Sequence, residues 1–241
     1  MFPSLNIIIP VYNEGENILR TLAGITENVL TPHHILIVYD FDEDNTLPVL
    51  ARYWSGKRNL ELVKNRYGRG VLNALKTGFD AVKEGVLLVV MADLSDDLSI
   101  VDGMFQKINQ GCDIVCGSRY MPGGRQVGGP LVKKFLSRLA GVSLHYLTGI
   151  PTRDITNSFK MYRKSVLEAI EIRSSGGFEV GMEIVVKAFL KGYRIAEIPS
   201  VWRDRAAGRS RFKLFKWLPK YACWYLYAVA GRVWKVGRYG G

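Results

Sequence analysis

The stretch Val86–Asp97, with the sequence VLLVVMADLSDD, decides the fold. Its first six residues are apolar, and a run this short and rich in valine and leucine is typical of a strand buried on both faces of a parallel sheet. Asp93, Asp96 and Asp97 follow, so three carboxylates gather at the sheet edge where open α/β folds bind ligands. Hard oxygen ligands in such a cluster favour Mg²⁺ or Mn²⁺ bound together with a phosphate. The alternative is a solvated turn that caps the next helix through Asp97 or Ser99.

Length and composition bound the class of protein. The chain has 241 residues, of which 48% are hydrophobic, so it suits one large α/β domain or a domain with a small appendage. The net charge of +11 indicates polyanionic partners: nucleic acid, an anionic membrane surface or phosphorylated substrates. Nucleic acid is disfavoured because the basic residues are spread over loops, without a recognition helix or an aromatic sheet motif. The three cysteines have no metal-ligand spacing and are expected to be reduced thiols. No signal peptide and no membrane-spanning run is expected.

Strands and helices alternate through the first half. The expected strands are Leu5–Val11, Ile35–Val38, Leu60–Val63, Val86–Met91 and Asp113–Gly117, and the expected helices between them cover 17–29, 46–54, 71–84 and 99–110. This alternation predicts a parallel, doubly wound sheet. The second half is less regular, with predicted helices over 130–147, 164–172 and 180–191 and a last strand over 193–199.

Two basic loops are candidate anion sites. Lys64–Gly70 carries two arginines and opens a helix, where backbone N–H groups suit a phosphate or a nucleotide. Arg203–Arg211 carries four arginines in nine residues, which favours either an anion clamp or a solvated basic turn.

The last segment, Phe212–Gly241, interleaves aromatic residues with lysine and arginine. Its longest uncharged piece, Tyr221–Gly231, has 11 residues, which is too short to span a bilayer but typical of a helix lying in the membrane interface. The alternative is that this helix packs on the sheet as ordinary core.

Six motifs occur in the order that family-2 glycosyltransferases show: IIIPVYNEGENI at 7–18, VYD at 38–40, ADLSDD at 92–97, GSRYMPGG at 117–124, TRDITNSFKMYR at 152–163 and DRAAGRSRF at 204–212. The chain therefore resembles this family over residues 5–215, and within it the polyprenyl-phosphate glycosyltransferases such as dolichol-phosphate mannose synthases. The resemblance implies an α/β fold: a single GT-A, Rossmann-like domain with a mostly parallel central sheet over 1–211, followed by amphipathic C-terminal helices. A nucleotide-sugar half would cover 1–117 and an acceptor half 118–211, with 212–241 as a membrane-surface tail.

The activity implied by the resemblance is inverting transfer from GDP-mannose or a UDP-sugar to a polyprenyl or dolichyl monophosphate. Two alternatives stay open: the same donor with a saccharide hydroxyl as acceptor, and a nucleotide-sugar binder without turnover. The expected location is cytoplasmic, peripheral at the cytoplasmic face of the membrane, and no nucleic acid partner is expected.

Carried over by motif, with Gly70 added from the basic loop, the expected nucleotide-sugar site consists of Pro10, Tyr12, Glu14, Val38, Asp40, Gly70, Ala92, Asp93 and Ser95. The expected acceptor and phosphate site consists of Arg119, Arg125, Glu183, Arg205, Ser210 and Arg211. The expected catalytic residues are Asp93, Asp154, Arg119, Arg205 and Arg211.

The implied roles follow from charge. Asp93, joined by Asp96, would hold Mg²⁺ or Mn²⁺ on the donor diphosphate, because Met91 replaces the first acid of the family's metal motif and a thioether is a poor ligand for a hard cation. Arg205 and Arg211 would stabilise the leaving diphosphate, and Arg119 with Arg211 would screen the acceptor phosphate. Asp154 would orient the acceptor, or act as general base for a hydroxyl acceptor.

Overall fold

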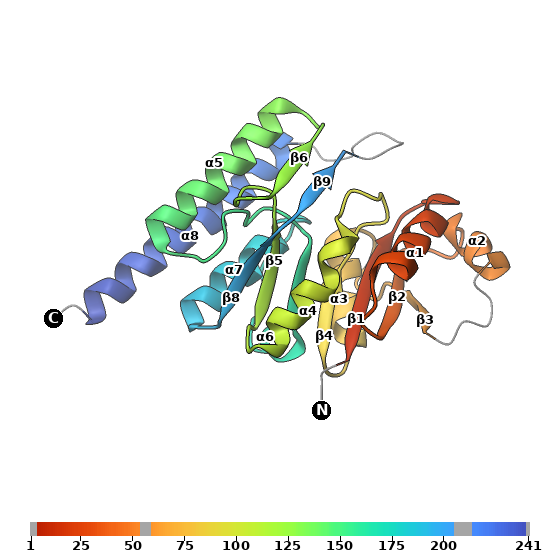
Figure 1. Cartoon of the computed structure of the whole chain (residues 1–241). Helices are drawn as coiled ribbons and strands as arrows, with labels where there is room; N and C mark the ends of the chain where they lie inside the picture. The colour runs from red at the N-terminus through yellow and green to blue at the C-terminus, as the bar shows by residue number, and fades with distance from the viewer. Residues whose placement is uncertain (1–3, 54–58, 205–213, 240–241) are drawn as a thin grey trace.

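The centre of the molecule is a seven-stranded sheet in the order β3-β2-β1-β4-β7-β5-β8 (Figure 1). The computed structural model describes residues 4–53, 59–204 and 214–239. The strands are β1 (Leu5–Val11), β2 (His33–Tyr39), β3 (Leu60–Lys64), β4 (Val86–Val89), β5 (Ile114–Ser118), β7 (Lys160–Arg163) and β8 (Ile195–Pro199). Neighbouring strands are parallel except at β7, which runs antiparallel to both β4 and β5. The mostly parallel sheet expected from the sequence is confirmed.

Helices cover both faces of this sheet. They are α1 (Asn17–Asn28), α2 (Thr46–Tyr53), α3 (Val71–Ala81), the short 3₁₀ helix η1 (Leu98–Ile100), α4 (Val101–Asn109), α5 (Leu131–Thr148), α6 (Lys164–Glu168), α7 (Val180–Lys191) and α8 (Leu214–Tyr239). Because side chains alternate along a strand, Ile7 and Ile9 of β1 pack with α1 and α4, whereas Ile8 packs with α3. The result is three layers, with helices α1, α2 and α4 on one face of the sheet and α3, α6 and α7 on the other.

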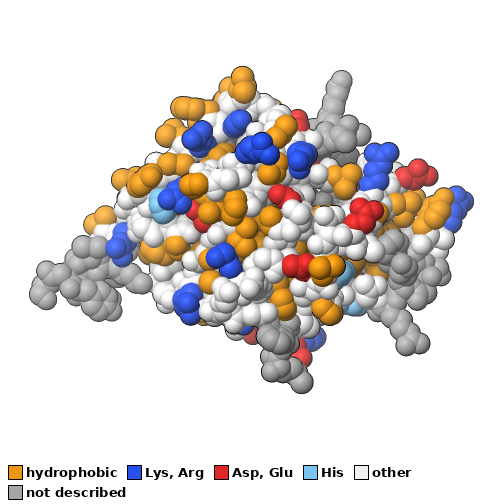
Figure 2. Space-filling view, in the orientation of Figure 1, with side chains coloured by type: hydrophobic (Ala, Val, Ile, Leu, Met, Phe, Trp, Pro, Cys, Tyr) orange, Lys and Arg blue, Asp and Glu red, His pale blue; other side chains and the backbone are white. Residues whose placement is uncertain are grey.

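The helices α5 and α8 lie side by side at one end of the sheet (Figure 1). Trp224 and Ala228 of α8 are buried in the same core as α7, and the Trp224 indole N–H donates to the Ser174 hydroxyl at 3.2 Å. Part of the C-terminal segment therefore packs as core, as the alternative to the interface helix supposed. On the face shown in Figure 2, hydrophobic side chains gather over α5 with lysine and arginine among them. Among the helices that the structure describes, none combines the length and the apolarity needed to cross a membrane.

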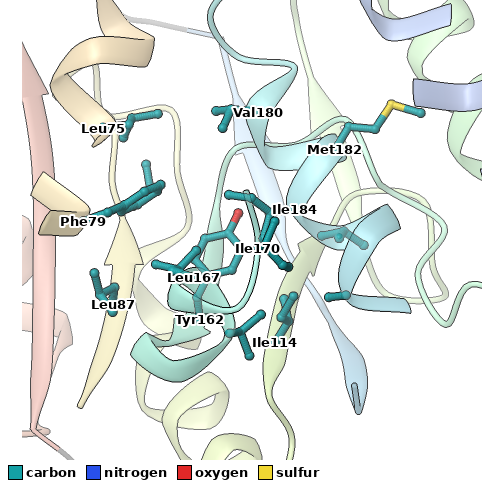
Figure 3. Close-up of a cluster of buried hydrophobic side chains, with 14 of the residues drawn as sticks. Leu75, Phe79, Leu87, Ile114, Tyr162, Leu167, Ile170, Val180, Met182 and Ile184 are labelled. Carbon is teal, nitrogen blue, oxygen red and sulfur yellow. The ribbon is translucent and has the colours of Figure 1, made fainter. Parts of the chain in front are cut away.

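A cluster of buried hydrophobic side chains packs α3 and α7 against the sheet (Figure 3). The rings of Phe79 in α3 and Tyr162 in β7 meet edge to face, with centroids 6.2 Å apart, and Ile184 of α7 lies in the same cluster. This packing positions the start of α3, directly after Gly70, and the start of α7 at one edge of the sheet.

One boundary differs from the sequence prediction in a way that matters for the site. The strand expected to reach Met91 ends at Val89. The Val90 N–H still donates to the Ile8 carbonyl, but the Met91 N–H donates to the Asp96 carboxylate, so the chain turns back on itself here. The helix expected over 99–110 is divided into η1 and α4.

A small parallel ribbon of β6 (Arg125–Val127) and β9 (Val201–Arg203) stands beyond the main sheet, next to this turn.

Candidate active site

A cleft of about 900 Å³ opens at the carboxyl ends of the parallel strands. It lies where strand order reverses, since β2 and β3 extend the sheet to one side of β1 and β4 to the other. The loops that follow β1, β2, β3, β4 and β5 each contribute to its wall, and α5 and α8 close the far side. Of the expected site residues, the cleft is lined by Pro10, Tyr12, Glu14, Asp40, Gly70, Ala92, Asp93, Ser95 and Arg119.

The loop after β1 is held by the acidic segment after β2. The buried Asp44 carboxylate accepts the Asn13 N–H at 2.9 Å, and the Thr46 hydroxyl accepts the Glu14 N–H at 3.0 Å. Asn13 has a φ of 54°, in the left-handed region where asparagine is among the most tolerated residues. The acidic segment after β2 therefore shapes the wall that carries Tyr12 and Glu14.

Aromatic and basic side chains form the next part of the wall. The Tyr12 ring meets the Phe41 ring edge to face at 5.5 Å, and the Arg69 guanidinium lies 4.6 Å from the centroid of Phe41. The Asp40 carboxylate accepts the Gly70 N–H at 2.9 Å and the Asn65 side-chain N–H at 2.7 Å. Asp40 therefore joins the loops after β2 and β3 into one surface.

Asp93 is the carboxylate of the ADLSDD segment that lines the cleft. Its Oδ1 accepts the Ser95 N–H at 3.2 Å. No group of three or more His, Cys, Asp or Glu residues suited to a metal ion exists within the described part of the chain. Asp93 supplies a hard carboxylate without a full set of protein ligands around it, which fits a divalent cation shared with a ligand diphosphate.

Asp96, which was expected to join Asp93 at the metal, bonds to the backbone of its own turn. Its Oδ2 accepts the Met91 N–H at 3.0 Å, and the side chain does not line the cleft. Burial, reinforced by the nearby charge of Asp93, raises the pKa of Asp96 to about 7. Asp96 is therefore a brace of the turn after β4.

Arg119 and Asp154 form a buried ion pair. Asp154 is fully buried, and its carboxylate accepts from Arg119 Nε at 2.6 Å, Nη2 at 2.8 Å and the backbone N–H at 2.9 Å. Burial alone would raise the pKa of Asp154, but the Arg119 charge and these hydrogen bonds hold it below its ordinary value. In this arrangement the Asp154 carboxylate holds Arg119 and does not line the cleft, and its role as orienting group or base stays a prediction.

Three further expected residues lie away from the cleft. Glu183 is buried, and it accepts the backbone N–H groups of Arg173 and Ser174 and pairs with Lys187 at 2.5 Å. Val38 is fully buried in the hydrophobic core, and Arg125 is exposed on β6. These three side chains do not line the cleft, and their binding roles stay predictions. Arg205, Ser210 and Arg211 lie outside the described residues.

The cleft also contains residues that the sequence prediction did not assign. Two are basic: Arg20, on α1, and Lys133, on α5. Arg20 could have been found from periodicity, since the buried Ile18, Thr21 and Leu22 leave it on the cleft edge of the helix. The largest omitted group is apolar or aromatic and comes mostly from α5 and α8: Leu136, Ala140, Phe178, Trp217, Leu218 and Tyr221.

Comparisons with known proteins agree on a family. Residues 6–171 match the model of glycosyl transferase family 2. The chain is 28% identical to a dolichol-phosphate mannosyltransferase of Pyrococcus furiosus, over 87% of this chain and 59% of the relative. It is 30% identical to a polyprenol monophosphomannose synthase of Mycolicibacterium smegmatis, over 85% of this chain and 79% of the relative. The chain thus spans 59% of the length of the first relative and most of the second.

Among solved structures, glucosyl-3-phosphoglycerate synthase from Mycobacterium tuberculosis in complex with UDP matches with a TM-score of 0.70. The match is 14% identical and covers 95% of this chain and 80% of that chain. At this identity the likeness concerns the fold, and it confirms the GT-A class expected from the sequence.

Proposed function

The chain belongs to glycosyl transferase family 2, and we propose that it transfers a sugar from a nucleoside-diphosphate sugar to the phosphate of a polyprenyl monophosphate, with inversion at the anomeric carbon. The observation that carries this proposal is the composition of the cleft. The loops at the sheet edge and α1 contribute polar and charged groups, including Asp93, Arg20, Arg69 and Arg119, whereas α5 and α8 contribute mostly apolar side chains together with Lys133 and Ser137. An acceptor with a phosphate head and a hydrocarbon chain matches both groups of side chains.

The donor fits the polar and charged groups. Hydrogen bonds hold the walls that carry Tyr12 and Asp40, and Arg20, Arg69 and Arg119 line the same cleft, which supports binding of a nucleoside diphosphate there. The names of both curated relatives specify mannose, which supports mannose as the transferred sugar. The nucleotide, GDP or UDP, is a question for the donor screen below.

The chemistry asked of the protein is electrostatic. An acceptor phosphate oxygen attacks the anomeric carbon, the bond from that carbon to the diphosphate oxygen breaks, and the nucleoside diphosphate leaves with the additional negative charge. Arg119 keeps its charge, and among the described residues four of its five N–H groups have protein acceptors, so it offers one Nη1 N–H at the cleft. Asp93 would hold Mg²⁺ or Mn²⁺, which neutralises charge on the diphosphate when bound.

The acceptor phosphate needs little help from a base, because it is already an anion near neutral pH. A saccharide hydroxyl would need a general base. Asp154 was expected to be that base, but both of its carboxylate oxygens accept hydrogen bonds from Arg119. This favours the phosphate acceptor over the saccharide. Arg205, Ser210 and Arg211 remain proposed phosphate ligands.

The membrane surface is the proposed location of the acceptor. Leu131, Phe135 and Tyr146 of α5 are 80%, 65% and 74% exposed, and Lys134 and Arg138 lie on the same helix (Figure 2). An exposed apolar stripe flanked by basic residues is typical of a helix that lies in an anionic interface. The opposite side of α5, with Leu136 and Ala140, lines the cleft, so a lipid chain could pass from the bilayer to the site. We propose that the protein lies at the cytoplasmic face, where anionic lipids concentrate.

A donor screen tests the proposal. Release of nucleoside diphosphate from GDP- and UDP-sugars is measured with and without polyprenyl phosphate, with Mg²⁺, Mn²⁺ or EDTA, and with saccharides as competing acceptors. The proposal expects release that depends on polyprenyl phosphate and yields a glycosylated lipid. Donor binding by calorimetry without release in any arm would instead support a binder without turnover, and release driven by saccharides would support the second acceptor class.

A further inference from the structure

The strand β9 joins the two sides of the cleft. One of its edges pairs with β6, with Gln126 in register with Trp202. Its other edge faces the turn after β4: the Val201 N–H donates to Asp97 Oδ2 at 3.0 Å, and the Arg203 N–H donates to the Ser95 carbonyl at 3.1 Å. The middle residue of the strand, Trp202, lines the cleft.

We propose that Asp97 is a positioning residue. Its hydrogen bond from the Val201 N–H, here called the clip, holds β9 against the turn that carries Asp93. The clip thereby fixes the distance between Trp202 and the donor site. The inference rests on the proposed function, because the role given to the clip is to align the acceptor side of the cleft, with Trp202, with the bound donor. Asp97 has no direct part in the chemistry, since it does not line the cleft.

Both carboxylate oxygens of Asp97 accept hydrogen bonds. One carboxylate oxygen accepts the strand N–H of Val201, and the other accepts the Ser99 hydroxyl at 2.5 Å. The strand N–H that Asp97 accepts lies at an edge of β9 that no other strand covers within the described structure. A carboxylate here takes the place of a neighbouring strand.

A displacement of β9 would alter the contacts of both Asp93 and Arg119. The Ser95 backbone bonds to β9 through its carbonyl and to the Asp93 carboxylate through its N–H, at 3.2 Å. On the opposite edge, the Gln126 side chain accepts from Arg119 Nη1 at 3.4 Å. The clip thus lies on a continuous set of contacts between Asp93 and Arg119.

The test uses the full chain with Asp97→Ala, Asp97→Asn and the control Ser99→Ala. Asparagine retains an oxygen that can accept the Val201 N–H, whereas alanine does not. Amide hydrogen exchange over residues 200–204 should rise in Asp97→Ala and stay near wild type in the other two variants. The turnover number should fall about 10-fold to 100-fold in Asp97→Ala with the donor KM changed less than about twofold, because misplacement by an ångström has effects of this size.

A double-mutant cycle separates positioning from general weakening. If Asp97 acts through the strand, Asp97→Ala should add little to the loss caused by Trp202→Ala, while independent effects would multiply. Unchanged exchange in Asp97→Ala, or raised exchange with unchanged turnover, would overturn the inference. A wild-type protein that transfers no sugar would overturn the proposed function and the kinetic role of Asp97 together, and the exchange measurement would still decide whether the clip exists.

Discussion

Arg119 and Asp154 meet through two side-chain hydrogen bonds, Nε to Oδ2 at 2.6 Å and Nη2 to Oδ1 at 2.8 Å, at the carboxyl end of the sheet. The pair places the Arg119 guanidinium at the wall of the cleft and satisfies a carboxylate that is fully buried. Its partners on the other side are Gln126 and Thr156, so the guanidinium plane is fixed before any ligand arrives. In the proposed reaction this is a preorganised group facing developing charge.

Substitution of Asp154 by asparagine should lower both stability and turnover. It leaves the Arg119 charge buried with a neutral partner, which we expect to reduce the free energy of unfolding by about 3 kcal/mol, measured by urea denaturation. Turnover per folded molecule should also fall, because the guanidinium loses its fixed orientation. The control is Glu197→Gln, which breaks the less buried Arg153 pair outside the cleft and should leave turnover per folded molecule unchanged. Equal turnover in the two variants would contradict a positioning role for Asp154.

Asp96 should make the protein less stable as the pH rises. Burial raises its pKa to about 7, so between its ordinary value of 3.8 and 7 the folded protein keeps a proton that the unfolded chain releases. Stability is therefore lost over this interval, at up to about 1.4 kcal/mol per pH unit, and stays lost above it. Asp96→Asn is neutral at every pH and can still accept the Met91 N–H. Its stability relative to wild type should grow from pH 4 to pH 7 in thermal melts, and a constant difference would refute the assignment.

Asp93 and Asp96 form a matched pair for the metal. Asp93→Asn should reduce turnover about 100-fold and raise the Mn²⁺ concentration needed for half-maximal activity, because it removes the carboxylate that faces the diphosphate. Asp96→Asn should leave the Mn²⁺ requirement unchanged. Titration of activity with Mn²⁺ in both variants tests whether Asp96 is a metal ligand. A higher Mn²⁺ requirement in Asp96→Asn would show that it is one.

Leu136 and Leu139 of α5 distinguish the two roles that we propose for this helix, binding of the lipid chain in the cleft and contact with a membrane surface. Leu136 lines the cleft, while Leu139 is 53% exposed on the surface. Leu136→Ser should raise the acceptor KM in detergent as well as in vesicles. Leu139→Ser should raise it only when the acceptor is embedded in anionic vesicles, together with weaker cosedimentation. Identical behaviour of the two variants would argue against two distinct faces of α5.

The local patterns of the sequence were sufficient for the mostly parallel sheet, but not for the antiparallel strand β7 or the β6–β9 ribbon. Short apolar runs such as Val86–Val89 predicted the buried strands, and their alternation with helices predicted the parallel sheet. Asp40, Gly70 and Asp93 were expected in one nucleotide-sugar site from the family motifs and the basic loop, and these residues do line one cleft. These features depend on neighbours in sequence, which a single chain displays.

The direction of each carboxylate could not be predicted, because it depends on partners remote in sequence. Asp93, Asp96 and Asp97 are nearly adjacent, yet one lines the cleft, one accepts the Met91 N–H and one accepts an N–H of β9. Asp154 was expected to face the acceptor because it lies in a polar motif, and its capture by Arg119 follows from the packing of the loop after β5. The sequence did not predict that Trp217 and Tyr221 line the cleft, because it left open whether their segment lies in a membrane interface or packs as core.

The dependence of the acceptor KM on hydrocarbon chain length tests the central claim most directly. Phosphate monoesters carrying one isoprene unit, a few units and a long polyprenyl chain are compared as acceptors in detergent, with wild type and Leu136→Ser. The account predicts that KM falls steeply with chain length in wild type and much less in the variant, since each added unit buries apolar surface against α5 and α8. Equal KM values for all chain lengths in wild type would contradict a lipid acceptor bound in this cleft.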